Sequence, residues 1–207
     1  MLPPEIPLFP LPNVVLFPNV FLPLHIFEPR YRAMVSDALK SERIIGMAML
    51  QPGWEADYLG RPRIYQIGCA GLMTHVDPLE GGRYNIILRG FEKFRILGEV
   101  EPADRPYRRA RIEGIEETIS DATRDLLRQG RSRLEELLST DIPGLGSKAI
   151  SDEDLVNALA QYMDLEPVEK QALLERDGLP ARCHSLIDLL EMKVISARHP
   201  VSASHSH

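Results

Sequence analysis

Cysteine is scarce in this sequence, which has two cysteines and one tryptophan among 207 residues. Cys69 and Cys183 lie far apart and outside any C-x-x-C pair or Cys/His spacing that a structural zinc site would need. We therefore expect two buried thiols, no bound metal and no cofactor. The N-terminus also lacks the basic stretch of a secretory signal, so we expect a cytoplasmic chain.

Acidic and basic side chains are missing from residues 6–27, a run long enough to suggest a membrane-spanning helix. Prolines interrupt this run at positions 7, 10, 12, 18 and 23, and each removes a backbone donor that such a helix would need. The run therefore predicts extended strands and turns, and no contact with a membrane.

Motifs for nucleotide hydrolysis and proteolysis are also missing. No G-x-x-x-x-G-K-[ST] loop is present, and GLGSK at residues 144–148 has neither its order nor its spacing. Ser147 and Lys148 are sequence neighbours and do not predict a catalytic dyad. His75 and Asp77 share a strand face, but no nucleophile accompanies them, so a surface pair is the better interpretation. We expect the chain not to be an enzyme, and a hydrolase is the least favoured alternative.

The stretch PLHIFEPRY, residues 23–31, brings a histidine, a glutamate, an arginine and a tyrosine close together. Glu28 stands at the N-cap position of a helix, Pro29 suits the first helical position, and Tyr31 begins an amphipathic period. His25 and Glu28 alone are only half of a metal site. We interpret the cluster as a strand-to-helix junction in which Glu28 caps the helix, Arg30 is its ionic neighbour and His25 is hydrogen-bonded near the strand end.

The apolar pattern changes along the chain. Up to residue 115 it alternates or is continuously apolar, which predicts about six strands, with a hairpin turn at Gly81-Gly82. Beyond that point four amphipathic stretches follow, the second opened by Ser151 and the third by Pro167. The charge changes as well, from 13 basic and 12 acidic side chains in residues 1–110 to 11 and 18 in residues 111–207.

These patterns predict an α+β fold in two domains. Residues 1–117 are expected to form a compact, barrel-like sheet of about six strands with one inserted helix. Residues 118–198 are expected to form a bundle of about four helices. Residues 199–207 are expected to be a disordered tail.

Three stretches resemble a known family. IPLFPLPNVVLFPNVFLPLHIFEPRYRAMVSDAL (6–39), IGCAGLMTHVDPLEGGRYNIILRGFEKFRI (67–96) and PYRRARIE (106–113) look like the Lon N-terminal domain family and occur in its order. The resemblance implies a PUA-like pseudo-barrel followed by a helical bundle. It also implies a part in recognising substrates for ATP-dependent proteolysis, without catalysis.

The leading hypothesis is therefore a non-catalytic module that binds unfolded polypeptide or a protein partner, with an ATP-dependent protease as one candidate partner. Its contacts are expected at apolar and aromatic side chains in segments that protrude, because such residues often anchor interfaces. For each of them the alternative is burial against the chain's own strands, above all for the phenylalanines. The candidates are Phe17, Phe21, Trp54, Tyr58 and Leu59.

RNA binding is the second hypothesis, raised by the PUA-like resemblance and by basic residues between positions 83 and 111. Four acidic residues offset half of that charge, alternation along strands spreads the rest, and the whole chain is acidic. We therefore rank RNA below polypeptide. The eight basic residues are Arg83, Arg89, Lys93, Arg95, Arg105, Arg108, Arg109 and Arg111.

Overall fold

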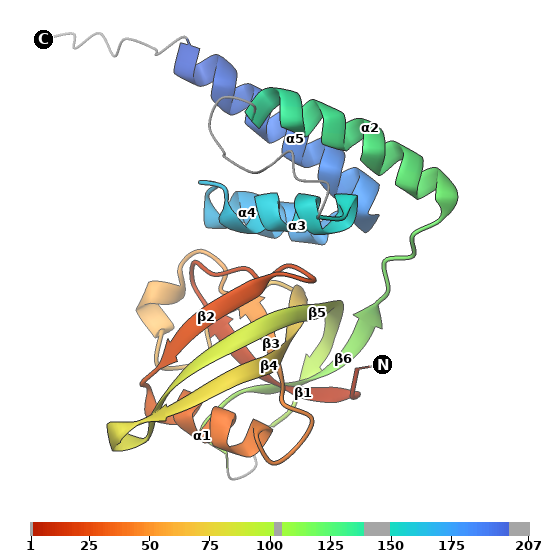
Figure 1. Cartoon of the computed structure of the whole chain (residues 1–207). Helices are drawn as coiled ribbons and strands as arrows, with labels where there is room; N and C mark the ends of the chain where they lie inside the picture. Colours follow the sequence, from red (N-terminus) through yellow and green to blue (C-terminus); the bar gives the residue numbers. More distant parts are fainter. Residues whose placement is uncertain (1, 102–104, 139–149, 199–207) are drawn as a thin grey trace, which may run out of the picture. The chain divides into compact units, whose positions relative to one another are not determined.

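The computed structural model describes residues 2–101, 105–138 and 150–198 (Figure 1). Ser147, Lys148 and the predicted tail 199–207 lie outside the described residues. The strands are β1 Glu5–Leu11, β2 Phe21–Ile26, β3 Ile44–Met49, β4 Ile67–Leu79, β5 Arg83–Glu99 and β6 Arg109–Ile115. The helices are α1 Pro29–Ala38, α2 Asp121–Leu138, α3 Asp152–Tyr162, α4 Pro167–Glu175 and α5 Gly178–Arg198, with short 3-10 turns at Trp54–Asp57 and Glu80–Gly82.

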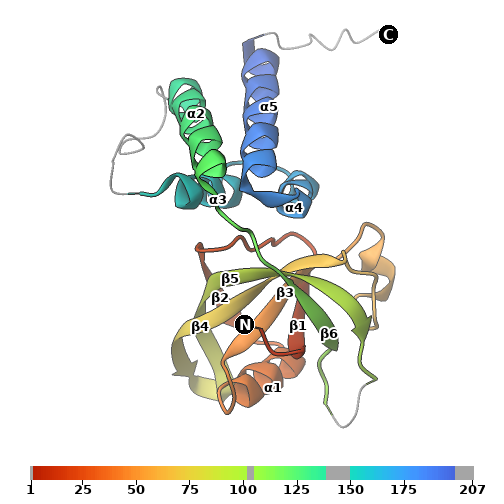
Figure 2. The same cartoon turned by 90° about the vertical axis from the view of Figure 1, so that its right-hand side faces the viewer.

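The strands form one mixed sheet of six, in the order β2-β5-β4-β3-β1-β6. Only β1 and β3 run parallel, and an additional pairing between β5 and β6 closes five of the strands into a ring. Helix α1 lies across one end of this ring in both views (Figures 1 and 2). The α+β prediction is confirmed, including the inserted helix between the second and third strands.

The prediction from the sequence pattern was wrong for strand β5. RYNIILRG and EKFRILGEV read as two strands, but residues 83–99 form one strand of 17 residues. Its first half pairs with β2 and its second half with β6, and register shifts against β4 and β6 mark where the strand is irregular. Such shifts bend a strand and raise its twist, which lets one long strand take part in both halves of a closed ring.

The interior of the ring is apolar. One cluster of fully buried side chains joins β1, β3, β5 and β6 through Ile6, Leu8, Phe94, Ala110 and their neighbours. Alternating inward positions on each strand supply these contacts, as the period of two requires. Cys69 is buried in β4, and Cys183 is buried in α5, where burial raises the pKa of its thiol to about 11.

The described residues divide into two compact units, one from Met1–Glu117 with Asn157–Glu175, the other from Thr118–Val156 with Arg176–His207. One boundary between these units falls after residue 117. Residues 157–175, however, group with the strands rather than with a separate bundle. Gln171 of α4 donates to the carbonyl of Ile67 in β4 at 3.0 Å, and Gln161 accepts from the Phe17 N–H at 3.2 Å.

In the second unit, α2 packs against α5. A Cβ on Gly130 would collide with the sulfur of Cys183, so these helices cross closely. Ser151 caps α3 as expected, because its hydroxyl accepts from the Asp154 N–H at 3.1 Å. Within the described ranges, no helix is long and apolar enough to cross a membrane.

Candidate functional site

The strand-to-helix junction and the connection between β3 and β4 meet at Glu28. One oxygen of its carboxylate accepts from the Tyr58 hydroxyl at 2.9 Å, and the other accepts from Arg30 Nε at 3.0 Å. Thirty positions separate Glu28 from Tyr58 in the sequence, so the spacing of residues gave no sign of this contact. It ties the first turn of α1 to residues 50–66, hereafter loop 50–66.

The predicted capping role of Glu28 is wrong in its chemistry. Glu28 occupies the N-cap position with extended backbone (φ −66°, ψ 134°) and Pro29 follows at the first helical position, but the Glu28 side chain bonds no backbone N–H. Its main-chain carbonyl accepts from Tyr31 and Arg32 instead. The carboxylate is engaged by a cation and a phenol, and both hydrogen bonds are charge-assisted.

Aromatic rings stack around Arg30. Its guanidinium lies 4.6 Å from the ring centre of Tyr31 and 5.2 Å from that of Tyr58. Trp54 meets Tyr58 edge-on at 5.5 Å, and both rings pack partly against the apolar core of the ring of strands. Four of the predicted contact and junction residues, Arg30, Tyr31, Trp54 and Tyr58, thus support one another, and Arg30 is the ionic neighbour of Glu28 as expected.

Loop 50–66 is held at both ends. Leu50 and Ile64 form an isolated antiparallel bridge, and the Gln51 N–H donates to the carbonyl of Arg63 at 2.8 Å. Gly53, with φ at 89°, turns the chain into the short helix at Trp54–Asp57. Beyond that helix Leu59 is 87% exposed. The result is a fixed loop that presents an apolar side chain to solvent.

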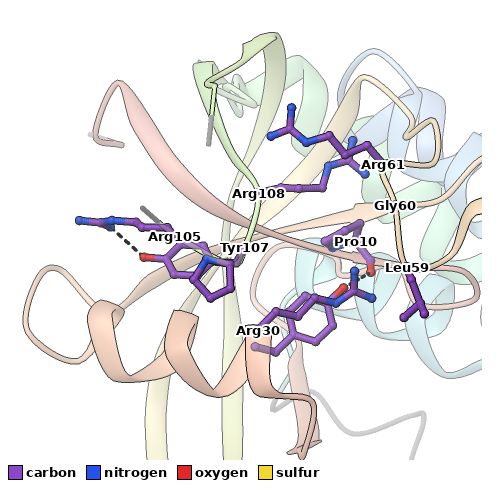
Figure 3. A pocket seen from close by; sticks show the side chains of 10 residues that line it. Pro10, Arg30, Leu59, Gly60, Arg61, Arg105, Tyr107 and Arg108 are labelled. Carbon is purple, nitrogen blue, oxygen red and sulfur yellow. Dashed lines mark hydrogen bonds between the residues drawn. The ribbon is translucent and has the colours of Figure 1, made fainter. Parts of the chain in front are cut away.

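A small cavity of about 120 Å³ opens beside Leu59. Figure 3 shows Arg30, Arg61, Arg108 and Leu59 around it, with Arg105 directed away toward the Tyr107 hydroxyl. Its wall contains four arginines and no acidic side chain. The lining residues are Pro10, Arg30, Tyr31, Leu59, Gly60, Arg61, Arg105, Pro106, Tyr107 and Arg108.

Three of the four arginines are paired outside the cavity. Arg30 pairs with Glu28. Arg108, which is buried, donates twice to Glu99 and once to the carbonyl of Pro62. Arg105 donates to the Tyr107 hydroxyl at 2.8 Å and lies 3.9 Å from Asp37.

The phenols and the carboxylate around this wall titrate away from their ordinary ranges. Burial raises the pKa of Tyr31, and burial together with the Glu28 carboxylate raises the pKa of Tyr58. The hydrogen bond from the Tyr107 hydroxyl, 2.8 Å long, lowers the pKa of Asp37. The tyrosines therefore stay neutral donors at neutral pH, and Asp37 stays ionised.

The remaining predicted contact residues fall on different elements. Phe17 is fully buried, so the expectation that it protrudes is wrong: its N–H bonds to Gln161 and its side chain fills the core. Phe21 is 49% exposed on β2, where its carbonyl accepts from the Tyr162 hydroxyl at 2.8 Å. His25 is exposed and hydrogen-bonded to Asn85 at 2.8 Å, as the junction interpretation expected.

His25, His75 and Asp77 line a second hollow, formed where β2, β5 and β4 lie side by side. Among the described residues no group of three or more His, Cys, Asp or Glu side chains is placed to hold a metal ion. This hollow therefore offers neither a metal centre nor the nucleophile that a hydrolase would need.

Three of the eight basic residues between positions 83 and 111 are held in buried or half-buried ion pairs, whereas Arg83, Arg89, Arg95, Arg105 and Arg111 are exposed. Lys93 is buried and pairs with Glu117 at 3.0 Å, and Arg109 pairs with Glu5 at 2.9 Å. Arg108 is buried in its pair with Glu99. Nucleic acid needs cations that remain free to meet phosphates, and these three ion pairs withdraw part of the basic charge from that role.

Comparison with known proteins identifies the family. A family model for the substrate-binding domain of ATP-dependent protease La (LON) matches residues 5–192. The chain belongs to this family. Lon protease 2 of Myxococcus xanthus is 26% identical over 203 residues, which cover 93% of this chain and 24% of that protein. Lon protease 2 of Syntrophobacter fumaroxidans is 29% identical over 181 residues, covering 84% and 22%. This Lon-family chain thus spans about a quarter of the length of these curated relatives.

Solved structures of the Lon family share the fold. The N-terminal domain of Lon protease from Mycobacterium avium complex superimposes with a TM-score of 0.68 at 19% identity, over 90% of this chain and 98% of that one. A Lon N-terminal domain protein from Xanthomonas campestris gives 0.61 at 22% identity, over 90% and 97%. The predicted family and fold class are confirmed, and the matched part of Lon is its substrate-binding domain rather than its protease domain.

Proposed function

We propose that this chain is a non-catalytic module that binds unfolded polypeptide through apolar contacts centred on loop 50–66. The observation that supports it best is Leu59, which is 87% exposed at the tip of a loop whose neighbouring side chains are fixed. Trp54 and Tyr58 extend the apolar surface toward the core. Phe21, on β2, is a separate apolar contact in the same proposal.

The geometry favours binding because the loop is ordered before a partner arrives. The bridge at its base, the Tyr58–Glu28 hydrogen bond and the stacked rings have already fixed the backbone and the aromatic rotamers. Binding then loses little further conformational entropy. An apolar side chain held in water also gains free energy when a partner covers it, at about 25 cal/mol per Å² of apolar area removed from water.

Membership of the Lon substrate-binding family supports the same function. Relatives that carry the name Lon protease are much longer than this chain, and we infer that an ATP-dependent protease of the cytoplasm is its partner in proteolysis. In that arrangement the chain selects polypeptide and another domain or protein hydrolyses ATP and peptide bonds. Purified alone, this chain is expected to do neither.

Leu59→Ala tests the proposal. Fluorescence anisotropy of a labelled, permanently unfolded protein such as reduced, carboxymethylated lactalbumin would report affinity for the whole chain. Leu97→Ala is the matched control, because Leu97 is 60% exposed on β5 and does not line the cavity beside Leu59. We expect Leu59→Ala to weaken binding about tenfold, by the loss of one apolar anchor, and Leu97→Ala to leave it unchanged.

The dependence of the affinity on salt concentration is the second measurement. Apolar contacts persist as ionic strength rises, whereas contacts between exposed charges are screened over about 10 Å at 0.1 M salt. Most of the affinity should therefore survive 0.5 M salt. Equal loss in the two leucine variants, or binding that disappears with salt, would assign the polypeptide to another surface.

A further inference from the structure

We propose that the arginine-lined cavity beside Leu59 binds one carboxylate of the polypeptide, either an acidic side chain or the C-terminal carboxylate. This inference rests on the proposed function and names the substrate class that the same loop would select. Leu59 belongs both to the apolar tip and to the cavity wall. One polypeptide can therefore place an apolar side chain on Leu59 and a neighbouring carboxylate in the cavity.

The size of the cavity limits its occupant. Its volume is about 120 Å³, whereas sites for drug-sized ligands and cofactors begin at about 300 Å³. A carboxylate with a few attached carbons fits such a volume, since one water takes about 30 Å³ in the liquid. A nucleotide does not fit.

The charge of the wall selects an anion of single charge. Arg30, Arg105 and Arg108 each face a carboxylate that lies outside the wall, respectively Glu28, Asp37 and Glu99. Among the described residues the guanidinium of Arg61 has no ion-pair partner within 4.0 Å. Asp57 accepts from the main-chain N–H of Arg61 at 3.1 Å but does not pair with its side chain. Arg61 is therefore the arginine of the wall without an ion pair among the described residues, and the Asp57 carboxylate lies nearby, against Gly60.

The donors that remain suit a carboxylate. Arg61 makes no side-chain hydrogen bond or ion pair among the described residues, so its planar fork is the main donor; Arg30 already bonds Glu28 through Nε and also the Tyr58 side chain. Guanidinium forks match the two oxygens of a carboxylate in geometry. Burial keeps Tyr31 protonated, so no phenolate in the wall repels the anion. The first turn of α1 also lines the cavity, and the partial positive charge there acts in the same direction.

Matched peptides test the preference of the cavity for a carboxylate. They also distinguish an acidic side chain from the C-terminal carboxylate. The probe is a fluorescent, leucine-rich, ten-residue peptide made as a C-terminal amide, as a free acid, and as an amide with one Glu in place of Gln. We expect at least one carboxylate form to bind the whole chain about fivefold more tightly than the plain amide, as a partly exposed ion pair allows. The form that gains affinity identifies the source, and the gain should shrink with salt.

Arg61→Gln should remove this gain and leave the affinity for the plain amide unchanged. Arg63→Gln is the matched control, because Arg63 is an exposed arginine two residues away that does not line the cavity. Equal affinity of all three peptides for the unmodified chain would overturn the carboxylate inference. If Leu59→Ala still weakened all three, the proposed function would stand without it.

A small probe tests the cavity even if no peptide binds. Butyrate, a monocarboxylate with a short apolar tail, should shift the NMR signals of the Arg61 Nε–H and the Leu59 amide, with an affinity on the order of millimolar. Butyramide, the uncharged analogue, should not shift these NMR signals, and Arg61→Gln should abolish the response to butyrate. Saturable shifts without any peptide binding would support the carboxylate site while contradicting the proposed function. Equal shifts with butyrate and butyramide would refute the carboxylate site.

Discussion

Two connections between strands both contain large apolar side chains but bury them to different extents. Residues 12–20 join β1 to β2, and loop 50–66 joins β3 to β4; both contain two prolines and large apolar side chains. In the first, Val15, Leu16 and Phe17 are all buried. In the second, Trp54 and Tyr58 are half-buried and Leu59 is exposed. Apolar composition therefore does not distinguish a core segment from a loop that exposes apolar side chains.

The backbone of the neighbouring strand makes the difference. A Cβ on Gly90 of β5 would collide with the carbonyl of Phe17, so glycine there lets residues 12–20 lie directly on the sheet. The N–H of Asn19 also donates to the carbonyl of Gly90 at 2.9 Å. Loop 50–66 is tied down only at its base and through side chains, which leaves its tip in solvent.

The largest expected effect comes from Phe17→Ala. Truncating a fully buried phenylalanine should lower the free energy of unfolding by about 3–5 kcal/mol, whereas Leu59→Ala should change it by less than about 0.5 kcal/mol. Urea denaturation followed by circular dichroism measures both. If Phe17→Ala cost no more than Leu59→Ala, residues 12–20 would not be part of the core, and the contrast between the two connections would fail.

A smaller effect is expected from the contact that anchors loop 50–66. Glu28→Ala removes the acceptor of Tyr58 and the ion pair of Arg30, and Tyr58→Phe removes the same hydrogen bond from the other side. In a double-mutant cycle the two changes should be coupled by about 0.5–2 kcal/mol. Additive effects would mean that Glu28 stabilises α1 alone, as the capping hypothesis held.

The smallest expected effect concerns pH, at the cavity wall that Tyr107 forms beside loop 50–66. Across the cavity from loop 50–66, the Tyr107 hydroxyl lowers the pKa of Asp37. A carboxyl with a depressed pKa stabilises the fold above its unfolded value of about 3.9 and loses that contribution as the pH falls through the folded value. Tyr107→Phe should therefore raise the pKa of Asp37 toward its ordinary range.

Carbon-13 NMR of the Asp37 carboxyl measures this shift directly. Tyr162→Phe is the control, since it removes a hydroxyl that bonds to the carbonyl of Phe21 and not to Asp37. An Asp37 carboxyl with the same pKa in the Tyr107→Phe variant and in the unmodified chain would show that the Tyr107 hydroxyl does not bond to Asp37 as described.

The sequence predicted the elements better than it predicted the site. Period-two and helical patterns located the strands, α1 and the helix starts at Ser151 and Pro167, because such patterns depend on neighbouring residues. The single strand β5 was missed, since its irregular positions interrupt the alternation at Gly90 and Gly98 without ending the strand. The cavity was missed as well, because Arg30, Arg61 and Arg108 come from three separate segments that only the closed ring brings together.

The candidate contact residues also differ in how well the sequence predicts their position. The burial of Phe17 depends on Gly90, which is more than seventy positions away, and nothing near Phe17 in the sequence indicates it. Leu59 could be predicted as exposed because prolines and polar residues surround it and a loop runs over the surface. The role of Glu28 could not be predicted, because a cap and a tertiary hydrogen bond use the same carboxylate.

Photo-crosslinking tests the central claim, that unfolded polypeptide binds at the tip of loop 50–66, most directly. A photo-reactive phenylalanine analogue would replace Leu59 in one sample and Leu97 in another, and each whole chain would be irradiated with the same labelled unfolded protein. Both positions are exposed, so both tolerate the change. We predict a strong crosslink from position 59 that excess unlabelled polypeptide suppresses, and a weak one from position 97. Equal crosslinking from the two positions, or a stronger product from position 97, would contradict the account.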